Sequence, residues 1–155
     1  MSKKDTGALL KFLKPFGEEL TDRVMWLREI VWDLYPNTNE LIYDNYNALA
    51  FGWSITDKLG HTFCSIAVGR TSKNVHFGFY RGNELKDPEE KLLGQGNQYR
   101  YILVENKAGF PEVYIRKLLK EAYANAKVKA AKESHSVEGK TIVKSISPVK
   151  RKRKN

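Results

Sequence analysis

Acidic side chains that recur along one predicted helix are the first candidates for chemistry in this sequence. A helix turns by about 100° per residue, and at that step four carboxylates fall within roughly 60° of one another, opposite the apolar stripe. A cation or a basic partner could bind there, and an ordinary solvated helix face has the same pattern. The four residues are Glu18, Asp22, Glu29 and Asp33.

A second group of metal-binding residue types has softer donor atoms and is incomplete. His61 and Cys64 lie three apart, and His76 falls on the next predicted strand. A structural zinc site normally has four such ligands, and here there are three. On a strand, His61 and Cys64 would also point to opposite faces. We therefore interpret Cys64 as a small buried hydrophobic residue and both histidines as partly exposed.

Polar and aromatic residues around one predicted strand define a candidate pocket. Hydrolysis needs a nucleophile beside a positioned base, and acid–base catalysis needs titratable groups with separated pKa values. No motif supplies either, so a non-catalytic binding module is expected. An enzyme with a small pocket beside the aromatic strand stays open as an alternative. The candidate pocket residues are Asp44, Tyr46, Phe77, Phe79, Arg81 and Arg100.

Nearly all of the net charge belongs to the C-terminal end. Of the formal +9, residues 127–155 contribute +8, with ten Lys/Arg against two Glu, and residues 1–126 contribute +1, with seventeen against sixteen. Cationic runs bind phosphate backbones with strong salt dependence, and they also occur as solvated ends. Accessory nucleic-acid binding is therefore a further alternative. Its candidate contacts are Lys150, Arg151, Lys152, Arg153 and Lys154.

Hydrophobic periodicity predicts the helices that would position these groups. Apolar residues repeat at steps of four and three between Glu18 and Leu34, which is typical of an amphipathic helix. A shorter helix is expected over residues 7–16. A third begins at Pro111 and keeps an apolar side as far as Ala126.

β-Branched and aromatic residues separated by turn signals predict consecutive strands. Their short connections require antiparallel pairing, because a parallel return needs a crossover of a dozen or more residues. The predicted fold is α+β, an antiparallel five- to six-stranded meander sheet with helices packed on one face. The strands are expected over residues 40–44, 47–55, 62–68, 75–80 and 98–104, with a weaker edge strand over 141–146.

Within the strand over residues 75–80, Phe77 and Phe79 point to one face and Gly78 to the other. A glycine inside a strand marks a close approach by another group. Either a packed protein segment or a ligand could be that group.

Length and composition favour one domain. A chain of 155 residues with 41% apolar content suits a single core. We expect the domain over residues 1–126 and a basic, partly helical or flexible extension over 127–155. No apolar run approaches the roughly 18 residues of a membrane span, and the N-terminus lacks a secretory pattern. With one cysteine and no internal disulfide, a cytoplasmic location without membrane attachment is expected.

The segment from Val75 to Gly96 resembles the bacterial YdhG-like family, a domain of unknown function. That family has a strand close to V-x-F-x-F, then R-G-x-x-L-x-D-P and L-L-x-G-x-G. Residues 42–54, 63–68 and 142–155 resemble one branch of it. The matching motif residues are Val75, Phe77, Phe79, Arg81, Gly82, Leu85, Asp87, Pro88, Leu92, Leu93, Gly94 and Gly96.

The resemblance implies a frataxin-like fold and a role in handling iron for cluster or haem assembly. For a non-catalytic binding module, docking of an unidentified protein partner or small ligand is the other expected role. The acidic helix face suits that implication, since hard oxygen ligands on an exposed helix bind iron weakly and release it to a partner. Asn97 and Tyr101 depart from the family pattern, which often has Lys and His there. Anion or metal binding at those two positions is therefore not expected.

Overall fold

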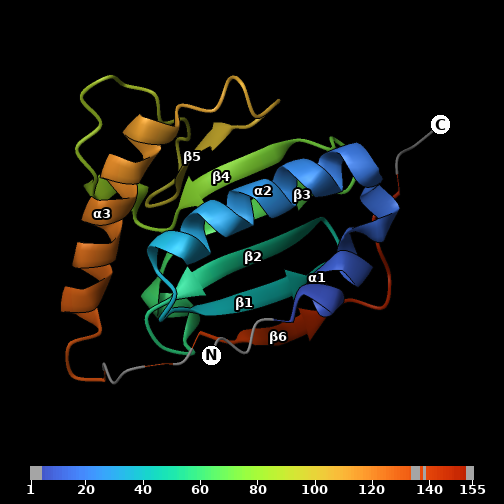
Figure 1. The fold of residues 1–155 in the computed structure, drawn as a ribbon, viewed down its shortest axis with the longest axis horizontal. Helices are drawn as coiled ribbons and strands as arrows, with labels where there is room; N and C mark the ends of the chain where they lie inside the picture. The colour runs from blue at the N-terminus through green and yellow to red at the C-terminus, as the bar shows by residue number, and fades with distance from the viewer. Residues whose placement is uncertain (1–4, 134–136, 138, 153–155) are drawn as a thin grey trace.

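The long helix α2 (Glu18–Leu34) lies along one face of a six-stranded sheet in the computed structural model (Figure 1). The structure describes residues 5–133, 137 and 139–152. Helix α1 (Thr6–Leu13) precedes α2, separated from it by a 3-10 turn, η1 (Lys14–Phe16), and α3 (Glu112–Lys129) stands at one end of the sheet at a steep angle to α2. The helix predicted over Glu18–Leu34 is confirmed with the same bounds.

The apolar stripe of α2 explains why this segment is a helix that packs on the sheet. Leu20, Val24, Leu27 and Val31 are all buried. The helix begins after Gly17, whose φ of 87° only glycine adopts readily. The predicted N-terminal helix is shorter than expected, because the chain tightens into the 3-10 turn η1 around Pro15.

The sheet has the strand order β5-β4-β3-β2-β1-β6, and the first five strands in the chain form an antiparallel meander, as predicted. Two further 3-10 turns lie in the connections, η2 (Leu59–His61) before β3 and η3 (Gly82–Glu84) after β4. The strand bounds are β1 Asn39–Asp44, β2 Ala48–Ser54, β3 Thr62–Gly69, β4 Val75–Phe79, β5 Arg100–Leu103 and β6 Thr141–Ile146.

The prediction of a wholly antiparallel sheet is wrong at β6, which pairs with β1 in parallel. Four strands and α3 separate β1 from β6 in the chain, and this long crossover allows the parallel return that a short link forbids. The register shifts between Ile42 and Tyr43. Residues 141–146 of the predicted extension therefore add a strand to the sheet.

A buried ion pair joins the helical layer to the sheet. Arg28 on α2 donates from Nε to Glu40 Oε2 at 2.7 Å and from Nη2 to Oε1 at 2.9 Å, with both side chains at most 4% exposed. Arg28 Nη1 also donates to Thr6 Oγ1 at 2.9 Å, and Thr141 Oγ1 donates to Glu40 Oε1 at 2.8 Å. One network therefore connects α1, α2, β1 and β6.

Gly78 faces away from the helices, and the group that approaches it is a protein side chain. A Cβ built at Gly78 would collide with the phenol ring of Tyr99, which crosses β4 just before β5 begins. Burial raises the pKa of the Tyr99 phenol to about 12, so the ring is neutral in its place. Packing by the protein itself accounts for this glycine.

Replacing Gly78 by alanine is expected to destabilise the protein by about 1–3 kcal/mol, because the half-buried Tyr99 ring must move to admit the new methyl group. Urea unfolding followed by tryptophan fluorescence measures the change. Gly60→Ala is the matched control, since nothing lies within 4 Å of the Cβ position there. Equal unfolding midpoints for the two variants would contradict the role assigned to Tyr99.

Candidate functional site

A cavity of about 480 Å³ lies where α1 meets the β3–β4 turn and the segment after β6. Five of its side chains are cationic and one is a carboxylate, which gives a net charge of +4. We call it the basic cavity. Its charged residues are Lys11, Asp44, Arg70, Lys73, Lys150 and Arg151, and its apolar wall is formed by Phe12, Pro15, Phe16, Ile146 and Pro148.

Separate elements bring these cations together. Lys11 comes from α1, and Lys73 lies in the β3–β4 turn with a φ of 60°, a left-handed conformation that costs a non-glycine residue about 1–2 kcal/mol. Its Nζ lies 4.8 Å from the centre of the Phe16 ring, and the Arg70 guanidinium lies 5.2 Å from the same ring. The aromatic ring thus holds two cations at one wall.

The segment after β6 closes the cavity through backbone contacts. The Ser147 N–H donates to the Asp44 carbonyl at 2.8 Å, and the Arg151 N–H donates to the Tyr46 carbonyl at 2.9 Å. These bonds hold Lys150 and Arg151 at the cavity. The predicted nucleic-acid contacts are therefore divided: these two line the cavity, Lys152 is exposed, and Arg153 and Lys154 lie outside the described residues.

Asp44 is neutralised within the cavity by two of the five cations, and the other three have no carboxylate partner among the described residues, although Arg151 Nη1 donates to Asn47 Oδ1 at 3.3 Å. Its Oδ1 accepts a hydrogen bond from Arg70 Nη2, and its Oδ2 lies 2.9 Å from Lys150 Nζ. In the described part of the chain, no carboxylate forms an ion pair with Lys11, Lys73 or Arg151. Three positive groups around an apolar wall can therefore hold an anion by charge-assisted hydrogen bonds.

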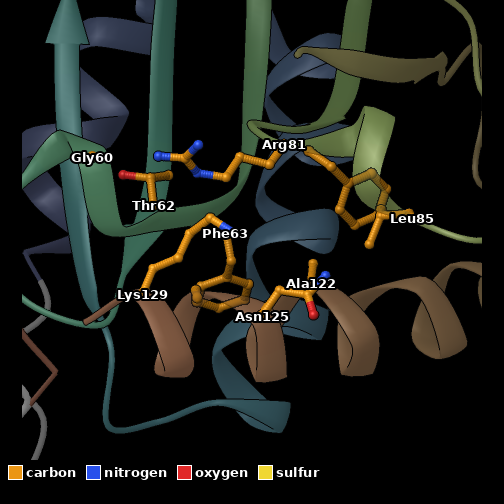
Figure 2. A pocket seen from close by; sticks show the side chains of 10 residues that line it. Gly60, Thr62, Phe63, Arg81, Leu85, Ala122, Asn125 and Lys129 are labelled. Atoms are coloured by element: carbon orange, nitrogen blue, oxygen red, sulfur yellow. The ribbon is translucent and has the colours of Figure 1, made fainter. Parts of the chain in front are cut away.

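A second, much smaller pocket lies at the opposite end of the sheet, between α3 and the ends of β3 and β4 (Figure 2). Its volume is about 20 Å³. We call it the Arg81 pocket. It is lined by Gly60, Thr62, Phe63, Phe79, Arg81, Leu85, Ala122, Asn125, Ala126 and Lys129.

The structure distributes the predicted pocket residues over several places. Phe79 and Arg81 line the Arg81 pocket, whereas Asp44 belongs to the basic cavity. Phe77 is fully buried in the core, and Tyr46 is 47% exposed. Arg100 donates to the carbonyls of its own loop, at Gly96 and Tyr99.

The acidic residues of α2 are spread along the helix. Asp22 forms an ion pair with Lys107 at 2.7 Å. Glu29 and Asp33 border a hollow that they share with Arg116, and Glu18 is exposed at the helix start. Among the described residues, no group of three or more His, Cys, Asp or Glu is placed to hold a metal ion. Iron binding by these four carboxylates stays a prediction.

The softer candidate ligands face different surroundings. Cys64 is fully buried, and burial raises the pKa of its thiol well above the ordinary value. The His61 ring lies 2.9 Å from Thr56 Oγ1 and 3.5 Å from Glu133. His76 stacks on Tyr101 at a centroid distance of 4.1 Å, and burial lowers its pKa.

Part of the segment that resembles the YdhG-like family has a structural role. The Asp87 carboxylate accepts hydrogen bonds from the Tyr114 phenol on α3 and from the N–H groups of Lys91 and Leu92. This fastens the loop between β4 and β5 to α3. The motif thus explains how the chain is held beside the Arg81 pocket.

Sequence reasoning missed Lys11, Arg70 and Lys73 as site residues. Lys11, on α1, lies far from the other two in the chain, whereas Arg70 and Lys73 both follow β3. None of the three belongs to a recognisable motif. The one available signal was the turn over residues 69–74, which contains two of the three. Only the pairing of β6 with β1 reveals that they share a cavity with the tail.

The fold and the basic cavity define a class: an α+β protein with helices on one face of a mostly antiparallel sheet and a cationic site at one end. In the part of the chain that the structure describes, no helix has the length and apolar character needed to cross a bilayer. Comparisons with protein-family models, curated proteins and solved structures found no match to this chain.

Proposed function

We propose that this protein is a binding module for a phosphate-bearing ligand, held in the basic cavity. The observation that supports it is the convergence of five cations from separate elements on a space with one carboxylate, which is already neutralised. Phosphate oxygens accept several charge-assisted hydrogen bonds at once, so they match lysine and arginine donors that no carboxylate neutralises. The cavity volume of about 480 Å³ is in the range of small-molecule sites.

The apolar wall supports a ligand with more than an inorganic anion. Phe12 is partly buried and lies beside Phe16, Pro15 and Ile146 in the cavity lining. A mononucleotide or sugar phosphate has an apolar or aromatic surface that would cover this wall. The phosphate would meet Lys11, Lys73 and Arg151.

A double substitution of Lys11 and Lys73 by glutamine is expected to weaken binding by about tenfold to hundredfold, because each lysine contributes one charged hydrogen bond to the phosphate. Isothermal titration with inorganic phosphate and with a mononucleotide measures the loss. The fold should remain, since both side chains are exposed.

The matched control removes the same charge elsewhere, at Lys117 and Lys120 on the exposed side of α3. Its phosphate affinity should equal that of the unmodified protein. Equal binding by the Lys11/Lys73 variant, or no phosphate binding by the unmodified protein, would show that the basic cavity is not a phosphate site.

The cationic residues after β6 favour an oligonucleotide as a second candidate ligand. Lys150 and Arg151 line the cavity and Lys152 follows them at the surface. A chain of phosphates would release more counterions than a mononucleotide, so its binding would fall more steeply with salt. Titration with a single-stranded oligonucleotide at two salt concentrations separates this case from a small ligand.

Membership of the YdhG-like family stays a proposal, supported by the motif over residues 75–96 and by the helix-covered sheet. Iron handling and an enzymatic role also stay proposals. For iron, the described residues offer no group of three or more His, Cys, Asp or Glu placed to hold a metal ion. Phosphate binding has the better support, since it has an assembled site.

A further inference from the structure

The Arg81 pocket contains polar groups that the protein itself leaves without partners. Thr62 is 4% exposed, and its Oγ1 has no hydrogen-bond partner among the described residues. The half-buried side chains of Arg81 and Asn125 also make no hydrogen bond or ion pair within that part of the chain. A buried polar group without a partner costs about 1–3 kcal/mol, which a bound water or ion can recover.

These groups and a lysine surround the same small space. Figure 2 shows the Arg81 guanidinium near Thr62 and the Lys129 side chain extending toward it from α3, while Asn125 lines the pocket from the same helix, near Ala122. Arg81, Asn125 and Lys129 donate hydrogen bonds, and the Thr62 hydroxyl can do so. Lys129 has one carboxylate neighbour, Glu84 at 2.9 Å. Because Glu84 balances the charge of Lys129, Arg81 is the pocket cation that has no carboxylate partner among the described residues. This guanidinium and the neighbouring donors favour an acceptor with negative charge.

The size and walls of the pocket restrict which anion fits. A volume of about 20 Å³ is small, so only a small polar group can enter, with the rest of a ligand remaining outside. The walls near Phe63, Phe79 and Leu85 are apolar. A flat carboxylate can enter with two oxygens toward the guanidinium, which pairs with it in a bidentate manner. A tetrahedral phosphate, with more oxygens, suits the larger basic cavity.

We propose that the Arg81 pocket is a second binding site, independent of the basic cavity, that takes the carboxylate group of a ligand. Arg81 holds the carboxylate, while Thr62 and Asn125 donate hydrogen bonds to it. The remainder of the ligand stays outside, over Leu85 and the last turns of α3. Both a small organic acid and the C-terminal carboxylate of a peptide have this chemistry.

The test is a titration of the full chain with sodium acetate, compared with sodium chloride at equal ionic strength, followed by two-dimensional NMR of amide groups. Acetate should shift the side-chain amide of Asn125 and the backbone amides of Gly60 and Thr62 in a saturable manner. Arg81→Gln should weaken the binding by about tenfold or more. Lys117→Gln, which removes an exposed cation of α3, should leave the affinity unchanged.

Three further comparisons sharpen the result. Arg81→Lys should bind acetate more tightly than Arg81→Gln and more weakly than the unmodified protein. Lysine keeps the positive charge but lacks the guanidinium that pairs with both carboxylate oxygens. A short peptide with a free C-terminus that binds more tightly than acetate, and loses binding when amidated, would identify a chain terminus as the ligand. Binding of acetate alone would identify a small acid.

The proposal is overturned if acetate causes no saturable shift at Asn125, or if Arg81→Gln binds acetate equally well with its melting temperature retained. Equal binding of inorganic phosphate in this pocket would overturn the assignment to carboxylates. Because Lys11 and Lys73 lie at the other end of the sheet, loss of phosphate binding in their double variant would not affect these measurements.

Discussion

Replacing Glu40 by alanine is expected to destabilise the folded protein by about 3–5 kcal/mol, since the change leaves the Arg28 guanidinium buried without its anion. Arg28 is 3% exposed and cannot reach water without moving α2. The substitution also removes the acceptor of the Thr141 hydroxyl. Because domains are stable by only about 5–15 kcal/mol, a large share of the total would be lost. Urea unfolding measured by fluorescence and by circular dichroism gives the value.

The control is the same substitution at Glu19, whose side chain is 86% exposed in its ion pair with Arg23. An exposed pair contributes about 0–1 kcal/mol, so Glu19→Ala should change stability little. The double variant Arg28→Met, Glu40→Leu should recover much of the stability lost in Glu40→Ala, because no unpaired buried charge remains. A loss below about 1 kcal/mol for Glu40→Ala would refute the assignment of a buried, mutually dependent pair.

Replacing Gly139 by alanine is expected to detach β6 from β1. Gly139 has a φ of 80°, which costs a residue with a Cβ about 1–2 kcal/mol. Its Cβ would also collide with the carbonyl oxygen of Pro36, a backbone atom that cannot rotate away. Since β6 positions the segment that contains Lys150 and Arg151, phosphate binding in the basic cavity should fall together with the pairing of the strand.

Hydrogen exchange of the β6 amides and limited proteolysis of the C-terminal segment measure the detachment. Both should accelerate in Gly139→Ala, while the amides of β2 and β3 keep their protection. Gly60→Ala serves again as the matched control, since its φ is not positive and its Cβ position is open. Unchanged protection of β6 in the Gly139 variant would exclude a tight backbone contact at this position.

The predicted effects of Glu40→Ala and Gly139→Ala both concern the attachment of α1 and β6 beside the basic cavity. Thr6 and Thr141 bind the Arg28–Glu40 pair from α1 and β6, and the same two elements provide Lys11 and Ile146 to the basic cavity. Loss of the ion pair would therefore loosen the elements that close the cavity. We expect phosphate affinity and stability to decline together in Glu40→Ala, whereas Gly78→Ala should lower stability alone.

The local sequence pattern was sufficient to predict α2 and the antiparallel order of β1 to β5. The bounds of α2 follow from the repeat of Leu20, Val24, Leu27 and Val31, because side chains three and four apart share a helix face. The antiparallel order of β1 to β5 follows from the short turns between them, which exclude a crossover. Both properties depend on residues close together in the chain.

The sites depended on contacts between distant segments, which periodicity does not encode. The direction of β6 was decided by its pairing with β1, about 100 residues earlier in the chain. The alternation of polar and apolar residues within β6 does not determine that direction. The single pocket expected around Asp44 and Arg81 became two, at opposite ends of the sheet. The sequence alone determined the helices, the meander and the cationic tail, since these arise from composition and short-range steric limits. Tertiary packing alone decided which cations share a cavity and which polar groups stay unpaired, because those depend on how remote surfaces meet.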